Sequence, residues 1–193
     1  MDAFSHSSAR IVVIGIGNDH RRDDGVGWAV VAELERRPLP RGVALFRSDG
    51  EPARLITAWA GARLAIVVDA GVATPPQPGR IHRLRGHRAR RQRPFGTTSS
   101  HGFALDGAVE LAQALGRFPA ELLVYAVEAA DTGLGAGLSP SVAAAVLPLA
   151  TRIERDLAPH LARHGSAGTE SHGKRPQRDG SARERAVEGP NGS

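Results

Sequence analysis

The sequence predicts a doubly wound α/β domain, in which a mostly parallel twisted sheet of about five strands carries helices on both faces. Short runs rich in valine, isoleucine and leucine recur along the chain, each with the length of a buried strand. Segments with apolar residues at helical spacing lie between these runs, an alternation typical of βαβ units. With 193 residues, 41% of them hydrophobic, the chain has enough apolar surface for one core of this kind.

Four apolar runs are too short for helices and suit buried strands, at residues 11–14, 43–46, 64–68 and 122–127. Residues 80–84 add a fifth strand, whose arginines suit the exposed margin of a sheet. Helices are expected at residues 25–37, 51–60 and 103–115, and from Ser139 to about residue 161. Asp23 and Asp24 favour the dipole at the start of the first helix, and Ser139 with Pro140 is typical of a helix start.

One domain is expected over residues 10–162, between a flexible N-terminus at 1–9 and a disordered tail at 163–193. From residue 165 onward the chain has no aromatic and almost no aliphatic residues, so the tail cannot offset its own ordering entropy. No run of about 18 apolar residues occurs, and the first ten residues lack the apolar segment of a signal peptide. We therefore expect a cytoplasmic monomer with no membrane partner.

The composition restricts the chemistry available to the chain. It contains no cysteine, which excludes disulfides, a thiolate nucleophile and cysteine-based zinc or iron–sulfur sites. The net charge of +5 is concentrated in residues 70–105, which hold seven arginines and no acid. The stretch RIHRLRGHRARRQR, residues 80–93, has no aromatic side chain to stack on a base. We expect a solvated basic strand and loop there, with an acidic protein partner as the second interpretation, and nucleic acid is not expected as a partner.

The stretch VVIGIGNDHRRDDGVG, residues 12–27, begins like a nucleotide-binding loop. Gly15 and Gly17 match the first two glycines of a dinucleotide fingerprint, but His20 stands where the third belongs. No acid ends the second apolar run, and Asp49 is the nearest substitute. The helix after the turn also opens with carboxylates, which repel phosphate and attract cations. A nucleotide-binding module is therefore disfavoured.

Three polar residues are expected at the carboxyl ends of the strands, where open α/β sheets place their working residues. Asp24 follows the glycine turn, Asp69 directly follows an apolar run, and His101 precedes the third helix. Two carboxylates and an imidazole form an open donor set that suits nickel, zinc, iron or manganese. Each residue alone also has a structural explanation as a cap or surface residue, so the hypothesis of a metal site depends on the three meeting.

The neighbours of these residues divide between structural and binding roles. Asp23 cannot point the same way as Asp24, so we expect Asp24 in the crevice and Asp23 as a cap or an acceptor behind it. Asn18 binds either backbone groups of its own turn or a peptide substrate, and Gly17 with Asn18 is the candidate for contact with a substrate. Residues 130–140, ADTGLGAGLSP, lack the Gly-Lys-Ser/Thr ending of a phosphate loop, and we expect a flexible lead-in to the last helix.

The order of four short motifs resembles that of the hydrogenase maturation proteases: G-x-G-N, D-D-G-x-G, an apolar strand ending in Asp-Ala, and Ser-His-Gly before a helix. The resemblance continues through VYAVEAADTGLGAGLSPSVAAAV and covers roughly residues 10–160. Proteins of this family are endopeptidases that trim the C-terminal extension from the large subunit of nickel–iron hydrogenases. The resemblance places the metal-binding acids of the family on Asp24 and Asp69 and its histidine on His101.

The resemblance also implies that nickel is supplied by the substrate precursor and sensed by these three residues, so that cleavage follows cofactor assembly. Other divalent cations suit the same donors. The expected chemistry is metal-assisted peptide hydrolysis, with a cation polarising the carbonyl or activating water and a carboxylate as the natural base. Asp24, Asp69 and His101 are therefore candidates for both metal binding and catalysis. In the alternative, the metal only positions the precursor.

Two other functions compete with this interpretation. Peptidyl-tRNA hydrolases also begin with an apolar strand and a G-x-G-N turn, and the basic stretch would suit tRNA. Their loop continues toward an Arg-His-Asn segment, however, where this chain has Asp-Asp-Gly-Val-Gly. A non-catalytic, metal-sensing maturation chaperone would have the same fold and the same ligands, so the sequence leaves that alternative open.

Overall fold

A five-stranded sheet forms the centre of the described part of the protein. The computed structural model describes residues 11–86 and 100–162, with the backbone alone at 100–104. The strands are β1 (Ile11–Ile16), β2 (Val43–Ser48), β3 (Leu64–Gly71), β4 (Ile81–Arg85) and β5 (Glu121–Glu128). The helices are η1, a 3-10 turn (Arg22–Gly25), α1 (Val26–Glu35), α2 (Pro52–Trp59), α4 (Ser100–Ala114) and α5 (Pro140–Ala162). The expected flexible N-terminus and tail lie outside the described residues.

The strand order is β2-β1-β3-β5-β4, and every neighbouring pair is parallel except β4 with β5. The chain moves outward from β1 to β2 and then crosses back to β3 on the other side. This reversal creates a switch point between β1 and β3, at the carboxyl ends of the strands. The prediction of a doubly wound α/β domain with an arginine-bearing edge strand is confirmed.

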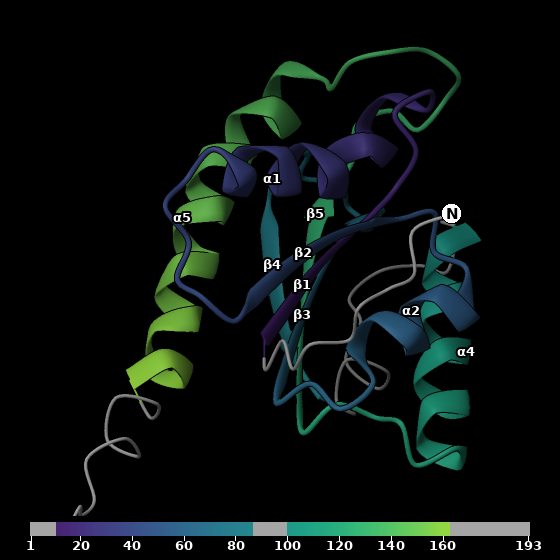
Figure 1. Cartoon of the computed structure of the whole chain (residues 1–193). Coiled ribbons are helices and arrows are strands. Elements are labelled where there is room, and N and C mark those ends of the chain that lie inside the picture. The colour runs from purple at the N-terminus through teal and green to yellow at the C-terminus, as the bar shows by residue number, and fades with distance from the viewer. Residues whose placement is uncertain (1–10, 87–99, 163–193) are drawn as a thin grey trace, which may run out of the picture.

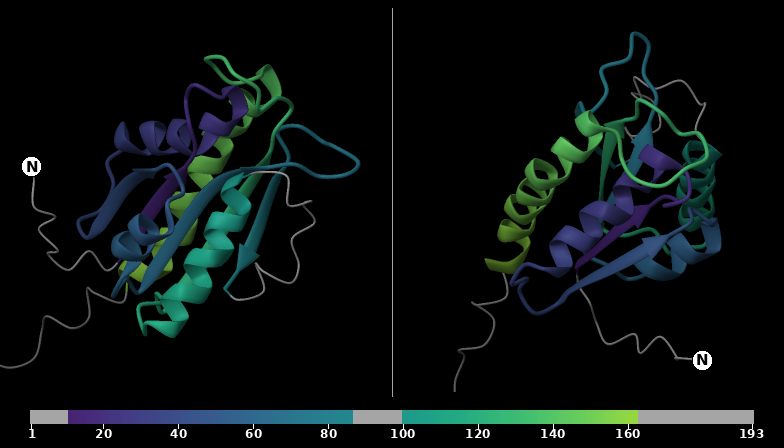
Figure 2. Two further views of the ribbon diagram at one scale, coloured as in Figure 1. Left: turned by 90° about the vertical axis from the view of Figure 1, so that its right-hand side faces the viewer. Right: turned by 90° about the horizontal axis from the view of Figure 1, so that it is seen from above.

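Two helical layers cover the sheet, with α1 and α5 on one face and α2 and α4 on the other (Figures 1 and 2). The apolar runs of the strands serve both layers because successive side chains of a strand point to opposite faces. In β3, Ile66 packs in the cluster below α1 and α5, whereas Val67 packs in the cluster below α2 and α4. Buried strands of this kind are apolar throughout, as the sequence indicated.

The boundaries of the helices follow local chemistry. Helix α2 begins at Pro52, and the side chain of Glu51 accepts hydrogen bonds from the amides of Ala53 and Arg54 at 3.0 and 2.9 Å. The acidic pair Asp23 and Asp24 lies in η1, directly before α1. Within the described residues, no helix is long and apolar enough to cross a membrane.

The edge strand β4 is less solvated than its arginines led us to expect. Arg83 donates two hydrogen bonds to Asp156 of α5, both at 3.0 Å, and one to the hydroxyl of Tyr125 at 3.1 Å. Tyr125 in turn donates to Asp156, and burial is the main cause that raises the pKa of Tyr125 to about 12. Arg83 therefore fastens β4 and β5 to α5. Residues 87–93 of the basic stretch lie outside the described part of the chain.

Candidate functional site

The glycines of the first turn allow η1 and α1 to lie directly against the end of β1. A Cβ atom on Gly15 would lie 2.1 Å from the carbonyl oxygen of Gly27, and one on Gly27 would lie 2.2 Å from that of Ile16. Gly17 has a φ of +154°, and its Cβ would lie 2.0 Å from the carbonyl oxygen of Asp24. Any side chain at these positions would collide with backbone. Close packing of the backbone therefore explains the glycine pattern without a bound phosphate.

The same packing brings Asp24 and Asp69 to the switch point. A Cβ on Gly27 would lie 2.6 Å from the carbonyl oxygen of Val68, so the start of α1 touches β3 as well as β1. Val68 precedes Asp69, and Asp24 lies three residues before Gly27. Both carboxylates are buried, at 3% and 4% exposure. One oxygen of Asp69 accepts a hydrogen bond from the amide of Ala70 at 2.9 Å.

The backbone of His101 lies in the first turn of α4, which begins at Ser100, three residues before the expected start. Its side chain lies outside the described residues. Asp69 lies two residues beyond Val67 and therefore faces the layer that contains α4. The side chains that are described contain no group of three or more histidines, aspartates and glutamates arranged to hold a metal ion. The three-residue metal site therefore stays a prediction that depends on His101.

Asn18 stabilises its own turn. Its Oδ1 accepts a hydrogen bond from the amide of His20 at 2.9 Å, and its carbonyl oxygen accepts one from the amide of Arg21 at 3.1 Å. This is the structural alternative for an asparagine after a glycine turn. Contact of Gly17 and Asn18 with a substrate stays a prediction.

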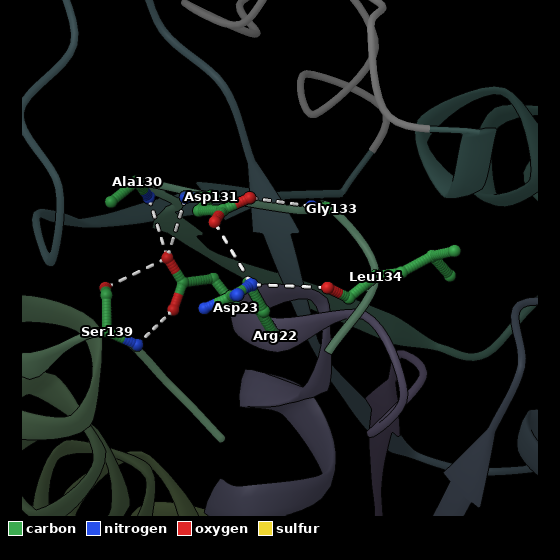
Figure 3. Close-up of polar contacts among 7 residues, drawn as sticks. All are labelled: Arg22, Asp23, Ala130, Asp131, Gly133, Leu134 and Ser139. Carbon is green, nitrogen blue, oxygen red and sulfur yellow. Dashed lines mark hydrogen bonds and ion pairs between the residues drawn. The ribbon is translucent and has the colours of Figure 1, made fainter. Parts of the chain in front are cut away.

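Asp23 is completely buried and acts as a hydrogen-bond acceptor, one of the two roles that the sequence analysis gave it, with all its partners in the loop between β5 and α5 (Figure 3). Its Oδ2 accepts hydrogen bonds from the amides of Ala130 and Asp131 at 2.8 and 3.0 Å and from the hydroxyl of Ser139 at 2.9 Å. Its Oδ1 accepts from the amide of Ser139 at 2.6 Å. Burial by itself raises the pKa of Asp23, but these hydrogen bonds outweigh it, so the pKa lies below its usual value. The carboxylate is therefore held in its charged form.

Backbone contacts add to this attachment of the loop between β5 and α5. The amide of Arg22 donates to the carbonyl of Gly135, and the amide of Gly135 donates to the carbonyl of His20, both at 2.9 Å. The side chain of Arg22 forms an ion pair with Asp131 at 3.2 Å and donates to the carbonyl of Leu134 at 3.3 Å. The expectation of a flexible lead-in to the last helix is therefore wrong, because its backbone is bound along η1. The hydroxyl of Ser139, expected to cap α5, donates to Asp23 instead.

The buried Glu128 pairs with the half-buried His82, a contact that the sequence analysis did not identify. Nε2 of His82 lies 2.6 Å from Oε1 of Glu128, whose Oε2 accepts a hydrogen bond from the amide of Gln77 at 2.6 Å. Ala126 of β5 is paired with Asp69 of β3 on one side and with His82 of β4 on the other. Glu128 lies two residues after Ala126, so the side chains of Asp69, His82 and Glu128 lie on the same face of the sheet. Glu128 ends an apolar run as Asp69 does, and the same strand-end criterion would have found it. His82 has no comparable signal, because it alternates with arginines on a basic strand.

Comparison with known proteins adds to this geometry. A family model described as hydrogenase maturation protease matches residues 28–156. The chain belongs to the hydrogenase maturation protease family. The hydrogenase expression/formation protein HupD of Bradyrhizobium diazoefficiens is 29% identical over 146 residues, which cover 75% of this chain and 76% of HupD.

Solved structures agree with this assignment. The hydrogenase maturating endopeptidase HybD from E. coli superposes with a TM-score of 0.71 at 26% identity, over 78% of this chain and 93% of HybD. The hydrogenase maturation protease HybD from Thermococcus kodakarensis has the same fold, with a TM-score of 0.64 at 24% identity, over 77% and 99% of the two chains.

Membership of the hydrogenase maturation protease family makes this chain a peptidase, which argues against the peptidyl-tRNA hydrolase interpretation. Asp69 and His101 lie within the range that the family model matches, whereas Asp24 and the glycine turn precede it. The position of Asp24 in this protease thus depends on its own structure, in which η1 brings it beside the end of β3.

Proposed function

We propose that this protease removes the C-terminal extension from the large-subunit precursor of a nickel–iron hydrogenase, after nickel has been inserted into that precursor. It acts in the cytoplasm as a monomer, and nickel arrives as part of the substrate. Membership of the hydrogenase maturation protease family supports the class of substrate. The observation that carries the site is the placement of two buried carboxylates, Asp24 and Asp69, at the switch point of the sheet.

The donor set fits a divalent cation. Two carboxylates brought to one edge of a sheet and shielded from water favour a positive charge between them. An imidazole from His101 on the adjoining helix would complete the O/O/N set that nickel accepts, as zinc, iron and manganese also do. A precursor without its metal would offer these donors no cation to bind, so its affinity for the protease would be lower. Recognition of the metal thus couples cleavage to the assembly of the substrate.

Hydrolysis of the peptide bond requires a general base and groups that position the substrate. Water attacks the carbonyl carbon of the scissile peptide bond, a carboxylate accepts the proton of that water, and the C–N bond breaks as the amine leaves with a proton. Asp24 or Asp69 is proposed as this base. The backbone at Gly17 and the side chain of Asn18, in the turn that leads to Asp24, are proposed to contact the segment that is cut.

The test compares nickel-loaded with nickel-free precursor, each incubated with the purified protease and weighed by mass spectrometry. We expect the nickel-loaded precursor alone to lose its C-terminal extension. Asp24→Asn, Asp69→Asn and His101→Ala should each abolish processing, while Asp49→Asn, an exposed carboxylate of the loop after β2, should leave it unchanged. If all three site variants cut as fast as the parent protein, the proposed site is wrong. Equal processing of both precursors would overturn the role of nickel.

A further inference from the structure

Leu134 is the most solvent-exposed large apolar residue of the described chain, at 83% exposure. The others are Leu147 at 59%, Leu115 at 55% and Leu111 at 45%; Leu147 and Leu111 lie on helices, and Leu115 lies in the turn that directly follows α4. A single exposed leucine is common on protein surfaces and needs no explanation by itself. Leu134 differs from the other three in two respects: its backbone is held by hydrogen bonds, and it lies near the proposed site.

The backbone that presents Leu134 is fixed on both sides of the residue. Its own carbonyl accepts a hydrogen bond from Arg22, and the next residue, Gly135, exchanges backbone hydrogen bonds with Arg22 and His20. Three residues earlier, Asp131 is held through its amide by the buried carboxylate of Asp23 (Figure 3). A contact residue presented from such a loop loses little backbone entropy when a partner covers it, so its apolar surface contributes more fully to affinity.

The surface around Leu134 adjoins the proposed site. The segment that holds the loop, η1, also carries Asp24. Arg21 forms a β-bridge with Gly135 and is exposed, and it makes no ion pair with any residue that the structure describes. Leu134 is therefore the neighbour in sequence of a residue whose backbone pairs with Arg21, an exposed arginine without an ion pair to any described residue. This combination fits an apolar side chain of a partner with an acidic residue next to it.

We infer that Leu134 is a docking anchor for the precursor, and that an apolar side chain on the folded body of the precursor covers it while an acidic neighbour faces Arg21. The inference rests on the proposed function, because a processing protease must hold its protein substrate while the C-terminal segment enters the crevice. Docking at Leu134 lies outside the chemistry of cleavage. It therefore sets the affinity for the precursor and leaves the rate of the bound complex unchanged.

The test measures KM and kcat for the nickel-loaded precursor, and the Kd of the same precursor, with the parent protein and four variants. Leu134→Ser should raise KM and Kd about 10-fold or more, because an apolar contact of leucine size is lost, and should leave kcat unchanged. Leu134→Met, which keeps an apolar side chain of similar volume, should retain most of the affinity that the parent protein has for the precursor. Leu147→Ser is the matched control, an exposed leucine on α5, and should change neither constant. Arg21→Ala should raise the Kd for the precursor at low salt and change it less at high salt, because salt screens the attraction between exposed charges.

The outcomes separate this inference from the proposed function. If the parent protein cuts the precursor and Leu134→Ser does so with unchanged KM and Kd, docking at Leu134 is wrong while the proposed function stands. If the parent binds the precursor through Leu134 without cutting it, the docking surface stands and the proposed function fails. Equal losses in Leu134→Ser and Leu147→Ser, or absence of binding by the parent protein, would also overturn the docking surface. Thermal melting of each variant identifies any loss that comes from unfolding.

Discussion

Replacing Asp23 by asparagine tests whether the buried carboxylate holds the loop between β5 and α5. The amide oxygen of asparagine can take the place of Oδ2 and keep its three donors, though without their charge assistance. The NH2 group would then stand where Oδ1 accepts from the amide of Ser139 at 2.6 Å, so a donor would face a donor. Loss of one hydrogen bond to a buried charge, together with weakening of three others, costs about 2–4 kcal/mol.

Urea unfolding, followed by tryptophan fluorescence and circular dichroism, measures this cost as a change in the free energy of unfolding. Asp19→Asn is the control, since Asp19 lies in the same turn and is largely exposed, with a 3.6 Å ion pair to His20. It should change stability by less than about 1 kcal/mol. If Asp23→Asn were no more destabilising than Asp19→Asn at pH 7, Asp23 would not be the attachment point of the loop.

The effect of Asp23→Asn should depend on pH in a defined direction. The folded protein depresses the pKa of Asp23, so the carboxylate contributes stability above the pKa of about 3.9 that it has in the unfolded chain. That contribution is lost as the pH falls below 3.9 and through the lower folded pKa. The difference in unfolding free energy between parent and Asp23→Asn should therefore be constant from pH 5 to 7 and shrink toward pH 2. A difference that grows on acidification would refute this reasoning.

Three further substitutions test packing contacts, and Gly107→Ala serves as the control for Gly27→Ala. Gly27→Ala should destabilise the protein by about 2 kcal/mol or more in urea unfolding, because its Cβ would lie 2.2 and 2.6 Å from two backbone oxygens. In Gly107→Ala in α4, nothing lies within 4 Å of the new Cβ, so this substitution should stabilise the protein by up to about 1 kcal/mol. If Gly27→Ala and Gly107→Ala changed the free energy of unfolding equally, the close approach of α1 to the sheet would not explain the glycine at position 27. Glu128→Gln should lower the free energy of unfolding by about 2–3 kcal/mol, because it replaces by a donor one of the two oxygens with which the buried Glu128 contacts His82 and the amide of Gln77. An unchanged urea midpoint for Glu128→Gln would show that the pair contributes no net stability.

Local patterns in the sequence were enough for the secondary structure and for two residues of the candidate site. The apolar runs and helical spacings depend on neighbours a few residues apart, so each strand and helix can be predicted from its own segment. Asp24 and Asp69 follow from the rule that parallel strands place their carboxyl ends at one edge. The different directions of Asp23 and Asp24 also follow, because consecutive residues at a helix start cannot point the same way.

The partners of the polar residues could not be predicted in this way. Asp23 binds Ser139, 116 positions later, and His82 meets Glu128 only because β4 pairs antiparallel with β5 in one register. No periodicity indicates such a pairing, since it depends on how distant segments pack.

The sequence by itself determined the alternation of strands and helices, the edge position of the basic strand, and the placement of Asp24 and Asp69 on the carboxyl-end side of the sheet, because these follow from local side-chain chemistry. The tertiary structure alone decided that the glycines serve close backbone packing, that Arg83 is paired with Asp156, and that the loop carrying Leu134 is fixed. Each of these depends on contacts between segments far apart in the chain, and a buried polar group takes whichever partner the packing brings within reach.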